Sequence, residues 1–238
     1  MHVTDGTVPA LIYVNNCLVA SRSLATLQPV HDAISKVWDI KNLGEPADFL
    51  SISIIHPSLS CICIHQSEYI EELADQCNIR TMPPHCLPMY PKVQFVIGMI
   101  SPMDSPERYC ALIGAFLHLA KCTRPVSFAN GVLSRYRQSP CDAHWDATLG
   151  TLRYCLLTTS LASTYGARQP GQLLAAQVYH DSDFASSQDC RRSTPGYVAV
   201  LNNAVVTWAS KKRETVALST MEAEYQSASL CGRDVVWL

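Results

Sequence analysis

The sequence contains no apolar run long enough to cross a membrane. Its apolar runs are short and interrupted, whereas a membrane-spanning helix needs roughly 20 consecutive apolar residues. The N-terminal region also lacks a cationic segment followed by an apolar one, which is the pattern of a secretion signal. We therefore expect neither membrane insertion nor secretion, and we expect an intracellular chain, cytoplasmic or nuclear, without a membrane partner.

The cysteines and the charge exclude two further classes of protein. The 11 cysteines are scattered and form no C-x-x-C pair, so the sequence does not predict a zinc cluster. Buried, reduced thiols are the expectation instead of a disulfide framework. The net charge is −2, so the basic excess of a protein that holds nucleic acid by electrostatics alone is missing, and any such contact must be local.

The first third of the chain reads as strands and two helices. With 238 residues, 48% of them hydrophobic, the chain can form one large domain or two small ones. Asparagine tolerates a positive φ angle, so Asn15 and Asn16 predict the two-residue loop of a hairpin over residues 11–20. The other elements expected here are a helix at 26–38, strands at 49–55 and 61–65, a helix at 68–77 capped by Ser67, and an extended proline-rich connector at 81–91.

The remainder changes from helices back to strands. Three helices are expected, then a linker, then a strand and a second hairpin whose loop is Asn202-Asn203. Ser219 and Glu222 have the S-x-x-E spacing of a capping box, which predicts a helix from about Thr220. The helices lie at 107–121, 125–139 and 142–157, the linker at 166–172, and the strands at 173–185, 196–201 and 204–210.

Acidic residues near the C-terminal end suggest a metal site. At 100° per residue, Glu224 shares a helix face with Met221 and Cys231, which is the expected core face, whereas Glu222 points away. Asp181 and Asp183 alternate onto one face at the end of a strand. Carboxylates converging from a strand end and a helix suit Mg²⁺, which prefers oxygen ligands.

A series of motifs, in order along the chain, resembles the Pol polyprotein of copia-type retrotransposons. The hairpin resembles that family's YVDD turn, and the K-N-L-G-E segment resembles its K-D-L-G-E motif. The most specific stretch, residues 179–225, resembles the opening of the family's ribonuclease H domain almost end to end. The motifs are "LIYVNN", "KNLGEPADFLSISI", "LIGAFLHLAKCTRP", "VLSRY" with "AHWDATLGTLRY", and "YHDSDF" through "MEAEY".

In the polymerase part, the resemblance implies a site that has lost its chemistry. The family's turn supplies two carboxylates that hold Mg²⁺ for nucleotidyl transfer, and here the turn reads Tyr13, Val14, Asn15 and Asn16. A two-metal site clamps the attacking and leaving oxygens between cations. Two neutral amides remove two negative charges from that site, and the family's other palm aspartate lies upstream of this turn, so we expect no polymerase activity.

In the ribonuclease H part, the resemblance implies an incomplete acidic site. Asp181 and Glu224 correspond to the first two of four metal-binding acids, with Asp183 as a neighbouring carboxylate, and the other two acids of the family lie further along the chain than Leu238. The implied cofactor is Mg²⁺ and the implied partner is an RNA–DNA hybrid. A basic cluster, Lys211, Lys212 and Arg213, offers a weaker contact to a phosphate backbone.

These observations predict an α+β chain in three parts. Residues 1–80 correspond to the end of a reverse transcriptase palm with a thumb remnant, residues 81–168 to a mainly helical connection, and residues 169–238 to the N-terminal half of a ribonuclease H-like α/β fold. The expected function is that of a catalytically inactive fragment derived from an RNA-directed DNA polymerase and hybrid ribonuclease. Two alternatives remain: a non-catalytic nucleic-acid-binding or interaction module, and a residual Mg²⁺-dependent nuclease.

Overall fold

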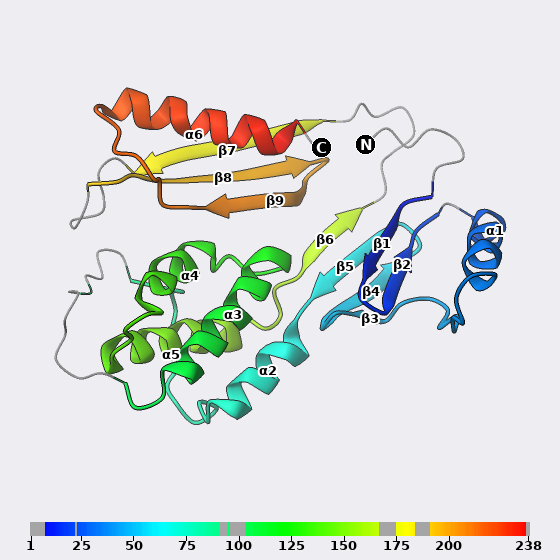
Figure 1. Cartoon of the computed structure of the whole chain (residues 1–238), viewed down its shortest axis with the longest axis horizontal. Coiled ribbons are helices and arrows are strands. Elements are labelled where there is room, and N and C mark those ends of the chain that lie inside the picture. Colours follow the sequence, from blue (N-terminus) through cyan, green and yellow to red (C-terminus); the bar gives the residue numbers. More distant parts are fainter. Residues whose placement is uncertain are drawn as a thin grey trace.

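Three antiparallel sheets and six α-helices make up the described part of the computed structural model (Figure 1). It describes residues 8–21, 23–90, 95, 103–166, 175–183 and 191–236. The expected α+β class is confirmed, while the division into family segments stays a prediction. None of the helices in these ranges is both long and apolar enough to span a bilayer.

The N-terminal hairpin has a different loop from the one that the asparagine pair predicts. Strands β1 (Ala10–Tyr13) and β2 (Asn16–Val19) pair with Tyr13 opposite Asn16. The two loop residues are therefore Val14 and Asn15, and Val14 has a φ of 50°. The expected loop of Asn15 and Asn16 is wrong by one residue, because the register that pairs Ile12 with Cys17 includes Asn16 in the second strand.

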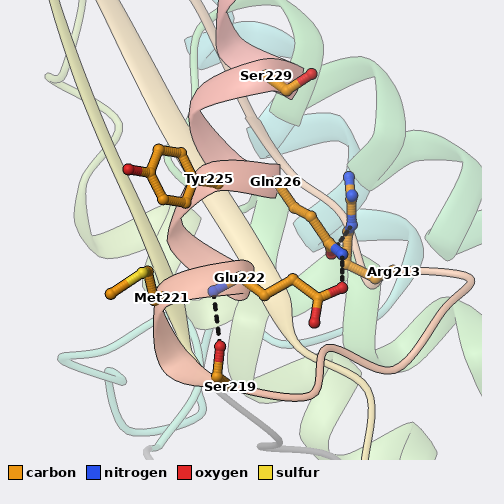
Figure 2. Close-up of a pocket in the computed structure, with 7 residues that line it drawn as sticks. All are labelled: Arg213, Ser219, Met221, Glu222, Tyr225, Gln226 and Ser229. Atoms are coloured by element: carbon orange, nitrogen blue, oxygen red, sulfur yellow. Dashed lines mark hydrogen bonds between the residues drawn. The ribbon is translucent and has the colours of Figure 1, made fainter.

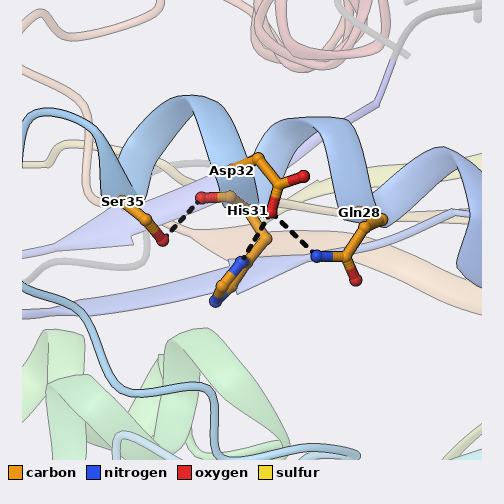
Figure 3. A network of polar contacts seen from close by, with 4 residues as sticks. All are labelled: Gln28, His31, Asp32 and Ser35. Atoms are coloured by element: carbon orange, nitrogen blue, oxygen red, sulfur yellow. Dashed lines mark hydrogen bonds and ion pairs between the residues drawn. The ribbon is translucent and has the colours of Figure 1, made fainter.

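Helix α1 (Leu24–Ser35) has no buried residue and contains Pro29, which removes one backbone donor. Side-chain hydrogen bonds lie along one side of the helix (Figure 3). The Gln28 amide donates to the Asp32 carboxylate at 2.8 Å, and the Ser35 hydroxyl donates to the His31 carbonyl at 2.8 Å. The bond from Gln28, and then a contact of the His31 ring with Asp32 at 3.4 Å, hold the pKa of Asp32 below its usual value. The expected helix is confirmed, although it ends three residues earlier.

A four-stranded sheet joins two distant parts of the sequence. Strands β3 (Asp48–Phe49), β4 (Ile52–Ser58) and β5 (Cys61–His65) follow one another, and β5 then pairs with β6 (Ser163–Gly166). The register between β4 and β5 shifts between Ile55 and Ser58, so β4 carries a bulge. The β6 strand was not predicted from sequence, because four residues give too short a pattern.

The helical core combines α2 (Ser67–Gln76), α3 (Pro106–Cys122) and α5 (Asp142–Leu157). Helix α4 (Ser127–Leu133) and the 3₁₀ turn η1 (Ser134–Tyr136) complete the expected helices. The largest buried apolar side chains come from the four helices α2 to α5 and from the segment after α2, and include Ile70, Ile79, Tyr109, Phe116, Leu119, Leu133 and Leu152. One hydrophobic core therefore includes α2, on the N-terminal side of the proline-rich stretch, and the helices that follow.

One local expectation in this region is wrong. Ser67 is the first residue of α2 and not its cap, and its hydroxyl donates to the Thr159 carbonyl at 2.9 Å. The expected proline-rich connector is confirmed in that residues 81–90 form neither helix nor strand, but it is attached to the helical core. The Thr151 hydroxyl donates to the Pro88 carbonyl at 2.8 Å, which fastens the connector to α5.

Arg124 links three helix ends. Its side chain is fully buried, and its guanidinium donates to the carbonyls of Thr158 and Thr159 just beyond α5. The neighbouring Thr123, at the end of α3, donates to the buried amide oxygen of Gln66, which precedes α2, at 2.9 Å. A buried guanidinium must be hydrogen-bonded to offset its desolvation, so Arg124 fixes where these helices end relative to one another.

The C-terminal unit is a three-stranded sheet covered by one helix (Figure 1). Strands β7 (Ala176–Asp183), β8 (Thr194–Leu201) and β9 (Ala204–Ser210) lie in that order, and α6 (Thr220–Val235) packs on β7 and β8. Asn202 and Asn203 both have positive φ angles, 47° and 65°, which confirms the second hairpin. The expected linker at 166–172 lies, apart from Gly166, outside the described residues, as do both ends of the expected strand at 173–185.

We expect Arg124→Met to lower the free energy of unfolding by about 2–4 kcal/mol, because two carbonyls lose a charged donor in a buried setting. The shift in the midpoint of urea denaturation measures it. Arg80→Ala is the matched control, because that arginine forms an exposed ion pair with Asp75 and should contribute less than about 1 kcal/mol. Equal effects of the two substitutions would contradict the role of Arg124.

Candidate functional site

The N-terminal hairpin, which the sequence predicts to match the family's polymerase turn, presents amides to solvent. Tyr13 is 56% exposed and Val14 at the tip is 82% exposed, and Asn15 and Asn16 are exposed beside them. An amide oxygen can ligate a cation but contributes no negative charge. The tip therefore lacks the charge that a two-metal centre needs to concentrate Mg²⁺.

Ser219 caps the start of α6, as its S-x-x-E spacing with Glu222 predicts, although Glu222 bonds the amide of Leu218 and not that of Ser219. The Ser219 hydroxyl accepts a hydrogen bond from the Glu222 amide at 3.1 Å (Figure 2). The Glu222 carboxylate reaches back and accepts from the Leu218 amide at 2.7 Å. Because two amides that would otherwise lack partners are satisfied, the helix begins at Thr220, as expected. This start fixes the position of Glu224 in the first turns.

The buried face of α6 differs from the expected one. Ala223, Ser227 and Cys231 are buried at four-residue spacing, whereas Met221 is 68% exposed. The Glu224 side chain is 47% exposed, so it lies at the boundary of the core face and not within it. The helix turns its small residues toward the sheet because the Ser227 hydroxyl donates to the Asp181 backbone carbonyl at 3.0 Å, which requires a close approach.

The acidic residues have partners of their own. Asp181 accepts a hydrogen bond from the Ser182 amide at 2.8 Å. Glu224 lies 3.9 Å from the Nδ1 atom of His180, and both side chains are partly exposed. Sequence reasoning missed His180 as a neighbour of Glu224, although its place beside Asp181 could have signalled it. Asp183 ends β7 with an exposed side chain.

The donor set does not fit a complete divalent metal centre. Within the described ranges, no three or more His, Cys, Asp or Glu side chains are grouped so that they could hold a metal ion. Asp181, Asp183 and Glu224 therefore do not form a three-ligand cluster there. That Asp181 and Glu224 share one cation stays a prediction.

The basic cluster is partly engaged in holding the C-terminal unit together. The Lys211 amide donates to the Pro195 carbonyl at 3.1 Å, and the Arg213 amide donates to the Ser193 carbonyl at 3.0 Å. The Arg213 guanidinium donates to Gln226 at 3.2 Å, and Gln226 donates to Glu222 at 2.9 Å. Arg213, Gln226 and Glu222 line a hollow along α6 (Figure 2). Arg213 thus has an internal role, and a phosphate contact by the cluster stays a prediction.

Aromatic residues that could stack on bases are used for packing. His144 is buried, and its ring stacks on Tyr136 with centroids 4.0 Å apart. Burial lowers the pKa of His144, which favours the neutral ring. Trp145 packs against the helical core and lies under the Arg108 guanidinium, 5.3 Å from its ring centroid.

Comparison with known proteins identifies relatives along nearly the whole chain. A Pol polyprotein from transposon TNT 1-94 of Nicotiana tabacum is 30% identical over 237 residues, which cover 96% of this chain and 18% of the relative. A putative transposon Ty5-1 protein of Saccharomyces cerevisiae is 31% identical over 234 residues, which cover 95% of this chain and 73% of the relative. A secreted RxLR effector protein of Plasmopara viticola is 39% identical over 131 residues, 55% of this chain and 90% of the relative.

Two of these relatives, from Nicotiana tabacum and Saccharomyces cerevisiae, are transposon proteins. The chain belongs to the family of copia-type retrotransposon Pol polyproteins. It spans less than a fifth of the length of the full Pol polyproteins that it matches. No protein-family model matches the chain, and neither does any solved structure.

We expect Ser219→Ala to weaken α6 by about 1 kcal/mol, because the Glu222 amide loses its acceptor. Hydrogen exchange of the first-turn amides measures the change, and exchange should quicken there by roughly fivefold. Ser229→Ala, further along the same helix, is the control and should change stability by less than about 0.5 kcal/mol. Unchanged exchange after Ser219→Ala would show that the cap does not hold the helix start.

Proposed function

We propose that the chain is a catalytically inactive fragment of a retrotransposon Pol protein, running from the end of reverse transcriptase into ribonuclease H. The observation that carries this proposal is the exposed hairpin tip, where Asn15 and Asn16 stand in place of the two carboxylates of the family's turn. Family membership supports the origin, and the residues at the tip support the loss of activity.

The C-terminal unit supports the second part of the proposal. An antiparallel hairpin follows a strand that ends in Asp181 and Asp183, and a capped helix carrying Glu224 packs against that strand. The family resemblance assigns the first two metal-binding acids, Asp181 and Glu224, to a strand and a helix in this same order. With no third acid grouped beside them in the described ranges, they are expected to bind Mg²⁺ weakly and to orient it poorly.

An interaction module is the less favoured alternative. The chain carries a net charge of −2, and Arg213 of the basic cluster is hydrogen-bonded to Gln226 on α6, which counts against the cluster as a dedicated contact to a phosphate backbone. The family's activities are synthesis of DNA on RNA and cleavage of the hybrid. They explain the origin of the sequence, and we do not expect this chain to retain them.

The purified chain is expected not to extend a primer on an RNA template with either Mg²⁺ or Mn²⁺, because amides at the hairpin tip cannot replace metal-binding carboxylates. Incorporation of labelled nucleotide measures this, with an active reverse transcriptase as the positive control. Template-dependent extension that disappears in Asn16→Ala but persists in Asn42→Ala, an asparagine outside the hairpin, would overturn the proposal for the polymerase part.

The chain is likewise expected to leave an RNA–DNA hybrid uncleaved above background in Mg²⁺, because two acids do not make a complete two-metal site. Gel analysis of end-labelled RNA in the hybrid measures cleavage. Glu224→Gln should match the unaltered chain. Clear cleavage that Glu224→Gln abolishes, and that Glu214→Gln leaves intact, would instead support a surviving nuclease.

A further inference from the structure

Cys61 and Cys63 form a pair of thiols that the proposed function does not use. They lie two residues apart on β5, and alternate residues of a strand point to the same face of a sheet. Strand β5 is internal, because β4 and β6 flank it on either side. Both side chains are half-buried and therefore remain accessible to a small solute.

The surroundings of the pair leave room for a bound ion. Cys61 is paired with Gly166 of β6, and a Cβ atom built on Gly166 would meet no described atom within 4 Å. Cys63 is paired with Thr164, whose hydroxyl lies 3.4 Å from the Cys63 sulfur and can donate to a thiolate there. Among the described residues, space is therefore open beside Gly166, the partner of Cys61, and a hydroxyl adjoins the Cys63 sulfur.

The two thiols also interact with each other. Desolvation raises the pKa of the Cys61 thiol, and a side-chain hydrogen bond with Cys63 raises it further. The two sulfurs are thus neighbours on the same face of β5. In the described ranges no third His, Cys, Asp or Glu completes a larger group with them, so the donors at this place on β5 are two sulfurs.

The spacing favours a bridging ion over a disulfide. Residues two apart on a strand have Cα atoms about 6.6 Å apart, which is near the upper limit of roughly 6.8 Å for a disulfide. A metal held by two sulfurs at about 2.3 Å each separates them by up to about 4.6 Å, which relieves that constraint. Thiolates are soft ligands and select soft cations such as Cu(I), which two ligands can satisfy.

We propose that Cys61 and Cys63 form a two-thiolate binding site for a soft monovalent cation, with Cu(I) as its chemical type. Binding replaces two S–H bonds by two sulfur–metal bonds and releases two protons to solvent. No electron is transferred in this step. The site lies on the four-stranded sheet, outside the C-terminal unit that carries Asp181 and Glu224, so it stands independently of the proposed function.

The test is a competition for Cu(I) between the reduced full chain and a chromogenic Cu(I) chelator under anaerobic conditions. The unaltered chain should withdraw one equivalent of Cu(I) from the chelator. Cys61→Ser and Cys63→Ser should each weaken retention at least tenfold, because a single thiolate cannot complete the site. The matched control is Cys122→Ser, which removes a thiol lying 3.5 Å from the His118 ring and should leave retention unchanged.

Two outcomes would overturn the site. One is retention of Cu(I) by Cys61→Ser or Cys63→Ser equal to that of the unaltered chain, and the other is loss of the bound equivalent in Cys122→Ser. X-ray absorption of the unaltered chain loaded with one equivalent of Cu(I) gives a test that needs no variant. Two sulfur neighbours are expected, whereas nitrogen neighbours or three or more sulfurs would contradict the assignment.

Discussion

The arrangement of the helices depends on one buried cation. Arg124 has no exposed surface, and its guanidinium is held by the carbonyls of Thr158 and Thr159. Carbonyls at the end of a helix lack intrahelical donors, and that end carries partial negative charge, so a buried cation there satisfies both. Thr159 also accepts the Ser67 hydroxyl. The ends of α2, α3 and α5 therefore meet at one polar point inside an apolar core.

Burial is distributed unevenly around that core. The described residues before Gln66 contribute none of the buried side chains, and α1 has none along its whole length. Apolar residues such as Ile12, Trp38 and Leu59 remain largely exposed there. The N-terminal hairpin therefore has little packing to support it, although a two-stranded hairpin is marginally stable alone. The N-terminal segment therefore carries motifs that resemble the family, but its described residues include no buried side chains that would stabilise it.

The site shows a similar separation between fold and chemistry. A sheet, a capped helix and a carboxylate at the helix boundary are all present, yet Glu224 lies beside His180 and Asp181 accepts a bond from its own strand. A fold positions side chains but does not supply their charges, so function must be argued from the residues at the site. At the N-terminal hairpin, the exposed side chains of Asn15 and Asn16 are neutral amides, so the backbone turn brings no carboxylate with it.

The sequence by itself determined the local elements. Both hairpins, the long helices and the Ser219 cap follow from periodicity, asparagine and capping residues, which act over a few positions. Only the tertiary structure decided which residues meet across distance. It paired β5 with β6 about 100 residues later in the chain, gave Ser67 a partner outside its own helix, and set the buried face of α6 through Ser227. These contacts depend on packing between segments far apart in sequence, which a local sequence pattern does not predict.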